Sequence, residues 1–345
     1  TRDTTDTRGI DPYGMVLGTL GLGALVFGLI EGQNYGWFTP KREFTVGGFT
    51  WPSDVISAPG VALILAVVLL VTFVLVEIRR KRAGKVVMMD VGLFRIRTFG
   101  NGNAVAMLVS LGEFGLLFIL PLFLQSVVGY SALETGVILV ALAAGSFVAS
   151  GAGASMAKRL GPVPVVRIGM ALEVAGVLWL ALMLSPTVSG WELVPGLFIY
   201  GMGVGFATAQ LTGIILSEVP VAESGMASAI QSTSRQVGAA IGTALLGAVL
   251  IGGLGSIQSD LTERGVPEEA AAQVTEVVQQ SAGTAVVALP QQPNGDVLFA
   301  GASEGFATAA RNVGFVAAGL IGLGLIAAFI MPKNAARTEA AGYVE

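Results

Sequence analysis

The sequence contains no cysteine and no histidine in its 345 residues. These absences exclude a thiol nucleophile, a disulfide framework, a Cys/His zinc site and an imidazole base. Charged residues are also scarce, at 12% of the chain, which is about half the roughly 25% found in soluble globular proteins. A net charge of −4 leaves no basic stripe to neutralise a run of phosphates, so nucleic-acid binding is excluded as well.

Apolar residues and glycine make up most of what is present. Hydrophobic residues account for 53% of the chain, and there are 48 glycines. So few charges cannot cover a water-exposed surface, and a helix needs about 20 mostly apolar residues to cross a bilayer. The apolar runs are continuous, unlike the alternating ten-residue strands of a barrel. We therefore predict an all-α polytopic membrane protein with eight transmembrane helices, at Tyr13–Ile30, Pro59–Val76, Ala104–Gln125, Thr135–Met156, Val163–Leu184, Leu193–Leu216, Met226–Leu254 and Arg311–Met331.

The positions of the basic residues predict how these spans are oriented. If the chain starts on the cytoplasmic side, 14 of the 19 Lys and Arg fall on that side and three on the other, as the positive-inside rule requires. All four tryptophans then lie near outer ends of spans, where they anchor at the interface. Segments 1–12 and 332–345 are accordingly expected to be cytoplasmic. Segment 1–12 is polar and lacks a signal-peptide pattern, which indicates a chain that begins in a loop: a fragment, a processed product or the second half of something longer.

Two of the connections between spans are long. Residues 77–98 contain the run RRKRAGK and are expected to form a basic cytoplasmic linker, beside anionic lipid. Residues 255–310 are expected to form an outer loop. Within it, helical spacing over 267–280 predicts a short surface helix, and the turn-rich stretch LPQQPNGD at 289–296 predicts a mobile loop.

A carboxylate in the middle of a predicted span is the main candidate for chemistry. Glu113 lies too deep in Ala104–Gln125 to reach water by snorkelling, and burying a charge there is costly. Ser110 and Phe114 share its helix face, and Pro121 frees a backbone carbonyl nearby. A carboxyl at this depth can take up and release a proton or attract a cation. The alternative is a structural, hydrogen-bonded Glu at a helix contact.

Two further ionisable residues lie inside predicted spans. Glu173 is flanked on its helix face by Gly169 and Gly176, and small residues at this spacing allow helices to approach closely. We therefore expect Glu173 inside a helix contact, with a second coupling role as the alternative. Arg235 lies in the polar opening IQSTSRQVG of the seventh span, where it could pair with a membrane carboxylate or with a helix end.

Polar side chains in the spans could line a substrate cavity. Tyr200 and Gln210, with Thr208 and Thr212, form a polar patch in the sixth span, although interhelical hydrogen bonding alone would account for them. The glycine string at 201–205 lies inside a span, so helix packing explains it better than a dinucleotide loop does. Serine-rich positions lack a general base, and no enzyme constellation emerges. The candidate cavity residues are Ser110, Phe114, Gln125, Tyr200, Gln210 and Arg235.

Four stretches resemble a known family. They are LIEGQNYGWFTP, LFRIRTFGN leading to LPLFLQSVVGYSALETGV, AKRLGPVPVVRIG, and SGMASAIQSTSRQVGAAIGTALLGA. Together they resemble the major facilitator superfamily, in particular its fourteen-helix drug:proton antiporters. The resemblance implies that the chain corresponds to helices seven to fourteen. Residues 13–76 would be the two linker helices and residues 99–331 the C-terminal six-helix bundle, without the N-terminal bundle.

The resemblance also points to a gating loop. Arg159 and Gly161 match the basic cytoplasmic loop between paired helices of this family. Lys158 stands where the family has an aspartate, which puts a gating role for this copy in doubt.

The resemblance implies the C-terminal portion of a proton-coupled exporter of the bacterial cytoplasmic membrane, working by alternating access. Its expected partners are a small amphipathic or cationic substrate, membrane lipid, and an N-terminal bundle in the same chain or in a partner chain. It would use the proton gradient and no cofactor, and Glu113 and Glu173 would couple proton to substrate. The alternative is a non-transporting membrane module, acting as a partner or regulatory half. An intramembrane enzyme would need a paired acid and base, for which only these two carboxyls are candidates.

Overall fold

The computed structural model describes residues 11–331 and confirms an all-α membrane protein. Among these residues, eight helices are long and apolar enough to span a membrane. They match the eight predicted spans: α1 (Pro12–Tyr35), α2 (Ala58–Arg82), α3 (Arg97–Ser126), α4 (Ala132–Leu160), α5 (Pro162–Met183), α6 (Gly190–Leu216), α7 (Ser224–Gly253) and α10 (Gly295–Phe329). Residues 1–10 and 332–345, which were expected to be cytoplasmic, lie outside the described residues.

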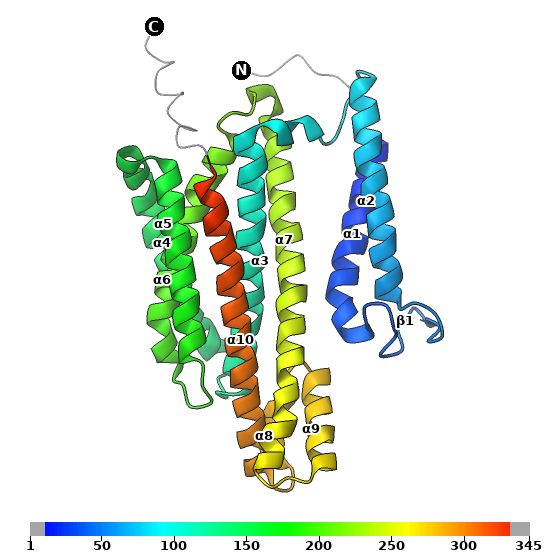
Figure 1. Cartoon of the computed structure of the whole chain (residues 1–345), viewed down its shortest axis with the longest axis vertical. Helices are drawn as coiled ribbons and strands as arrows, with labels where there is room; N and C mark the ends of the chain where they lie inside the picture. The colour runs from blue at the N-terminus through cyan, green and yellow to red at the C-terminus, as the bar shows by residue number, and fades with distance from the viewer. Residues whose placement is uncertain (1–10, 332–345) are drawn as a thin grey trace.

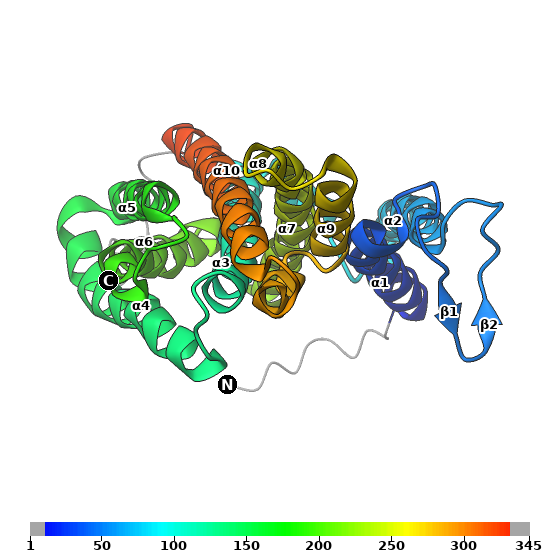
Figure 2. The ribbon, with the colours of Figure 1, turned by 90° about the horizontal axis from the view of Figure 1, so that it is seen from below.

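The helices form two parts, a hairpin and a bundle. The α1–α2 hairpin stands beside a bundle of the other six long helices (Figure 1). Within the bundle, α4, α5 and α6 form one group and α3, α7 and α10 the other, as the view along the helices shows (Figure 2). Helix α6 packs between α4 and α5, and α10 joins the groups by packing on both α5 and α3.

Several helices begin at residues that cap them. Asp11 accepts a hydrogen bond from the backbone of Gly14 at the start of α1, and Ser57 caps α2 in the same way. Ser131 forms a capping box with Glu134 at the start of α4. Side chains at these positions satisfy backbone N–H groups that a helix start leaves unpaired. The sequence thus fixes the starts of these helices locally, before any packing.

The connection between α1 and α2 contains the only strands in the described part of the chain. Strands β1 (Thr45–Val46) and β2 (Phe49–Thr50) pair antiparallel. The two residues that join them, Gly47 and Gly48, both have positive φ, of 57° and 85°. This conformation belongs to the tight hairpin turns that favour glycine at both central positions.

The basic linker is largely structured. Residues 77–82 continue α2, and a short 3₁₀ helix, η1 (Val91–Arg95), leads into α3. Buried Glu77 accepts hydrogen bonds from the backbone N–H groups of Met88 (2.9 Å) and Met89 (3.2 Å). Lys81 pairs with Asp90. These contacts hold the linker against the end of the hairpin, which we call the basic end of the molecule.

The predicted outer loop is mostly helical. The expected surface helix at 267–280 is confirmed as α9 (Glu268–Gln280). The stretch around it also forms η3 (Leu254–Ser256), α8 (Ile257–Glu263) and η4 (Thr284–Gln291). A further short 3₁₀ turn, η2 (Val221–Glu223), precedes α7.

Two expectations about this stretch need correction. Helix α10 begins at Gly295 and continues through Arg311, which therefore lies inside the helix and not at its edge. Most of 289–296 is also ordered, because η4 runs to Gln291 and Leu289 is buried in the core. Hydropathy misses this extension because it carries Asp296, Ser303, Glu304 and Thr308 among small residues, although most of it is buried.

Helix α6 packs closely against α4 and α5 because of the glycines at 201–205, which the sequence predicted to serve helix packing. A Cβ on Gly203 would lie 2.5 Å from the Glu173 nitrogen and 2.6 Å from its Cγ on α5. A Cβ on Gly205 would lie 2.5 Å from the carbonyl oxygen of Ser146 on α4. The glycines therefore serve helix packing, as expected for small residues at membrane helix contacts.

We predict that Gly203→Ala destabilises the protein by about 1–3 kcal/mol, because the added methyl group overpacks the α5–α6 contact. Thermal unfolding of the purified intact protein measures this. The control is Gly213→Ala on the same helix, where a Cβ meets nothing within 4 Å. Because alanine has a higher helix propensity than glycine, this variant should be as stable as the unmodified protein or more stable. Equal melting temperatures for the two variants would contradict this account of the packing.

Candidate functional site

The predicted coupling residue Glu113 is buried near the middle of α3 and faces a charged partner. Its side chain is about 5% exposed, and its Oε2 lies 3.8 Å from Nη2 of Arg235 on α7. Its Oε1 has no hydrogen-bond partner among the described residues. Of the two interpretations of Arg235 left open by the sequence, pairing with a membrane carboxylate is therefore the one that the structure shows.

Glu173 and Tyr200 complete a buried polar cluster with this pair. Glu173 is fully buried on α5, at the predicted helix contact with Gly203. It lies within electrostatic reach of both Glu113 and Arg235, and Tyr200 on α6 lies within reach of both carboxylates. Neither carboxylate oxygen of Glu173 nor the Tyr200 hydroxyl has a hydrogen-bond partner among the described residues. Four helices thus direct two carboxyls, a phenol and a guanidinium into one region of the bundle, which we call the charged cluster.

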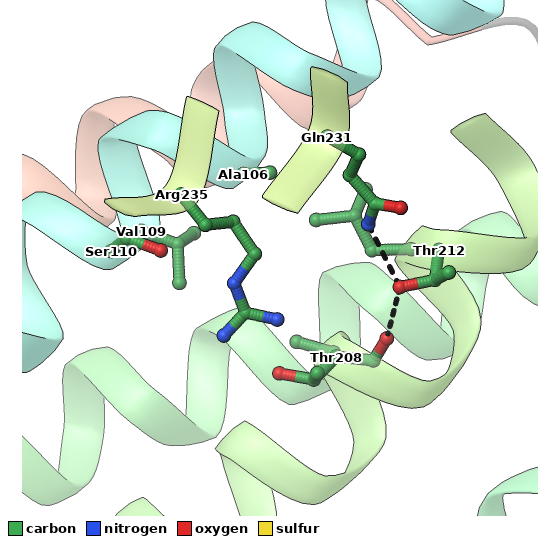
Figure 3. A pocket seen from close by; sticks show the side chains of 9 residues that line it. Ala106, Val109, Ser110, Thr208, Thr212, Gln231 and Arg235 are labelled. Carbon is green, nitrogen blue, oxygen red and sulfur yellow. Dashed lines mark hydrogen bonds between the residues drawn. The ribbon is translucent and has the colours of Figure 1, made fainter. Parts of the chain in front are cut away.

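A pocket adjoins the charged cluster and shares Arg235 with it. The pocket is a small notch with a volume of about 10 Å³, about the space that one water molecule needs and far below the roughly 300–1,000 Å³ of typical ligand sites. Figure 3 shows Arg235 reaching into it from α7, with Ser110 on α3 on one side. Neither Glu113 nor Glu173 lines the pocket. Arg235 is therefore the residue that connects the buried carboxyls to the pocket wall, whose lining residues are Ala106, Val109, Ser110, Ala207, Thr208, Leu211, Thr212, Gln231 and Arg235.

A hydrogen-bonded pair forms another part of the pocket wall. Gln231 on α7 donates a hydrogen bond of 2.8 Å to the Thr212 hydroxyl on α6, and Thr212 in turn donates to the Thr208 carbonyl at 3.3 Å. Figure 3 shows this chain opposite Arg235. Gln231 was not among the cavity residues predicted from the sequence. It lies four residues before Arg235, so the two share a helix face, and that spacing could have identified it.

The other predicted cavity residues divide between the cluster and the bundle surface. Ser110 is fully buried, lines the pocket and leaves its hydroxyl unpartnered. Phe114 is 41% exposed on α3, and Gln125 is exposed near the end of that helix, donating to the Pro121 carbonyl. Gln210 lies near Gly153 of α4. None of Phe114, Gln125 and Gln210 lines the pocket.

The residues of the predicted gating loop lie outside this cluster, at the α4–α5 connection. Arg159 is exposed in the last turn of α4. Gly161 has φ of +89°, a conformation that side chains other than glycine rarely adopt. The loop therefore requires its glycine for the turn itself, whatever its part in gating.

The charged cluster can hold and exchange protons. Burial in an apolar bundle penalises each ionised carboxylate, and the guanidinium offsets part of that penalty for a neighbour. Among residues 11–331, no group of three or more His, Cys, Asp or Glu side chains could hold a metal ion.

Comparison with known proteins identifies relatives of this chain. It is 30% identical over 253 residues to the probable actinorhodin transporter of Streptomyces coelicolor, covering 71% of this chain and 40% of that protein. It is 30% identical over 261 residues to the multidrug resistance protein Stp of Mycobacterium tuberculosis, covering 76% of this chain and 44% of that protein. It is also 27% identical over 241 residues to the methylenomycin A resistance protein of Bacillus subtilis, covering 70% of this chain and 47% of that protein.

The chain spans less than half the length of these relatives. Residues 11–243 match the profile of the Major Facilitator Superfamily. The match covers most of the helices described above, including every residue of the charged cluster, and it agrees with a polytopic fold of eight candidate spans. The chain belongs to the major facilitator superfamily.

Proposed function

We propose that this chain forms part of a proton-coupled exporter that exchanges protons for a small amphipathic, cationic substrate by alternating access. The observation that carries the proposal is the buried Glu113–Arg235 pair, in which the carboxyl is covered and the guanidinium lines a pocket. The names of the relatives, two multidrug or antibiotic resistance proteins and a probable transporter, support export. The second bundle of a transporter of this kind would come from elsewhere in the same chain or from a partner chain.

The number of protons in the charged cluster sets its charge. With Glu113 and Glu173 both ionised, Arg235 leaves the cluster with one net negative charge, which attracts a cation. Each bound proton adds one positive charge, so two protons leave Arg235 unneutralised beside the pocket. A unit charge about 8 Å from a bound cation, at an effective dielectric of about 20, changes its energy by about 2 kcal/mol. That is about thirtyfold in affinity.

Mutual exclusion of protons and cations is what exchange requires. On the side where the cluster loses its protons, a cation binds more tightly. On the side where protons return, the cation is expelled. Arg235 transmits the change, because it contacts both the carboxyl and the pocket. The distribution of basic residues supports an orientation in which the basic end faces the cytoplasm.

The alternative is a non-transporting membrane module. The described pocket is small and is lined by three helices of one bundle, which fits a half that needs a second bundle to enclose a substrate. The buried carboxyl of Glu173, which has no hydrogen-bond partner among the described residues, favours the transport proposal, because a purely structural module gains nothing from its cost.

We predict that Glu113→Gln abolishes pH-driven export of cations by the intact protein, because residue 113 can then no longer alternate between charged and neutral. Export of a fluorescent lipophilic cation from proteoliposomes with an imposed pH gradient measures this. The control is Glu134→Gln, in which the amide oxygen can still accept the capping hydrogen bonds from Ser131. Unchanged pH-driven export of every substrate by Glu113→Gln would contradict the proposed role.

The double variant Glu113→Gln/Arg235→Gln separates charge from fold. It removes both members of the ion pair, so the cluster regains the net negative charge of Glu173 that Arg235 balances in Glu113→Gln. We predict that cation binding recovers by roughly tenfold or more relative to Glu113→Gln alone, while coupling to the proton gradient stays absent. Equilibrium binding to the purified protein measures the recovery, and equal affinities for the single and double variants would exclude Arg235 as the transmitting residue.

Glu173→Gln should behave differently from Glu113→Gln. It removes the second negative charge of the cluster, so we predict weaker cation binding but continued dependence of transport on the proton gradient through Glu113. Measuring affinity and pH dependence on the same preparation tests this. Loss of pH dependence with unchanged affinity would instead assign the coupling role to Glu173.

A further inference from the structure

The α1–α2 hairpin is a compact unit with one main attachment to the bundle. Gly18 and Gly28 of α1 pack on Phe73 and Leu63 of α2, so the two helices hold each other. In the bundle, α1 packs on α7. Figure 2 shows α1 on the inner side of the hairpin, facing α7 and α9, with α2 and the two strands outside. The hairpin thus meets the rest of the molecule on the helix that carries Arg235.

A single glutamine makes the polar contact at this attachment. Gln33 donates its side-chain amide to the carbonyl oxygens of Ala244 (3.0 Å) and Thr243 (3.4 Å) on α7. Gly247 leaves room for it, because a Cβ there would lie only 2.5 Å from Oε1 of Gln33. A side-chain amide that bonds helix carbonyls inside an apolar region fixes both the height and the rotation of that helix.

The stretch LIEGQNYGWFTP holds this glutamine in place. Gly32 packs against the ring of Trp37, which a Cβ on Gly32 would approach to 2.6 Å. Gly36 ends α1 with φ of +90°, and the Ser57 hydroxyl donates to its carbonyl at 2.7 Å. The turn after Gln33 is therefore fixed on both sides. This stretch, which the proposed function leaves without a role, builds the support for Gln33.

A second contact lies beyond the end of α1. Arg42, in the connection between α1 and β1, donates to the carbonyl oxygen of Gln280 at the end of α9 at 3.3 Å. The hairpin therefore meets the bundle at two levels, on α7 and on α9. Two separated contacts restrain a tilt that one contact would permit.

We propose that Gln33 is a positioning residue that braces α7 and so sets the distance between Arg235 and Glu113; this rests on the proposed function. The carbonyls that it bonds lie eight and nine residues beyond Arg235 on α7, about 12 Å along the axis. The Arg235–Glu113 separation is 3.8 Å, so a shift of about 1 Å in α7 lengthens the ion pair appreciably. Without the brace, Arg235 lies farther from Glu113 and attracts its ionised carboxylate less strongly. The pH at which transport is half-maximal then changes.

Cysteine cross-linking tests the contact of Gln33 with α7 at Gly247, which we call the joint, without relying on transport. In a cysteine-free background of the intact protein, Gln33→Cys with Gly247→Cys should react efficiently with a short bifunctional thiol reagent. Gln33→Cys with Gly252→Cys is the control, because a Cβ on Gly252 meets nothing within 4 Å. Cross-linking in the first pair only is expected. No cross-link, or equal cross-linking in both pairs, would overturn the joint.

Transport tests the positioning role. Gln33→Leu removes the amide, and Gly247→Ala displaces it from the α7 side. Each should move the pH midpoint of export by about half a unit or more, and because they break the same joint, the double variant should match the single ones. Gly252→Ala on the same helix should leave the midpoint unchanged.

The outcomes distinguish this inference from the proposed function. If the unmodified protein shows no proton-coupled export, the proposed function fails, and cross-linking still decides whether the joint exists. If Gln33→Leu and Gly247→Ala both export with the pH midpoint of the unmodified protein, the positioning role of Gln33 is wrong and the proposed function is unaffected. If cross-linking at 33 and 247 blocks export reversibly, the joint must open during transport, which also overturns a fixed brace.

Discussion

A guanidinium and a carboxylate that meet inside an apolar helix bundle impose the main constraint on this structure. Glu113 cannot be left ionised without Arg235 at low cost, because an unpaired charge at its buried position loses its hydration with little in return. The pair therefore fixes the relative positions of α3 and α7. It also makes the bundle responsive, because each proton that the carboxyls bind adds one positive charge beside the pocket wall.

The second carboxyl, that of Glu173, explains how such a pair can favour a cation or a proton. A lone ion pair is neutral and would favour neither a cation nor a proton in the pocket. Glu173, fully buried and within electrostatic reach of both partners, gives the cluster an excess of acid. Its position depends on the absence of a side chain at Gly203, which lets α5 and α6 approach closely enough to bury it. Packing and electrostatics are thus linked at one helix contact.

Sequence reasoning predicted the spans and the most important residues, because their signals are local. Long apolar runs fix α1 to α7, and a charge inside such a run identifies Glu113, Glu173 and Arg235 without any knowledge of the fold. The contact between Glu113 and Arg235 was one of two possibilities, since the 121 residues between them carry no distance information. The structure supplies that distance.

Other features could not be predicted, for reasons that are equally physical. Helix α10 begins at Gly295, in a stretch that packs against α8 and η4 but lacks the hydropathy of a span because it carries Asp296 and Glu304. Phe114, Gln125 and Gln210 have suitable chemistry, but their side chains lie away from the pocket, and no periodicity reveals which face of a membrane helix turns towards a cavity. The joint at Gln33 needs Gly247 opposite it, a pairing that is visible only once α1 lies against α7.

The central claim is that protons and a cation exclude each other through the charged cluster. The most direct test is to bind a lipophilic cation to the purified intact protein in weak buffer and to measure the protons released. The account predicts release on binding to the unmodified protein and a clear loss of that release in Glu113→Gln. Proton uptake on binding, or the same release from both proteins, would contradict it.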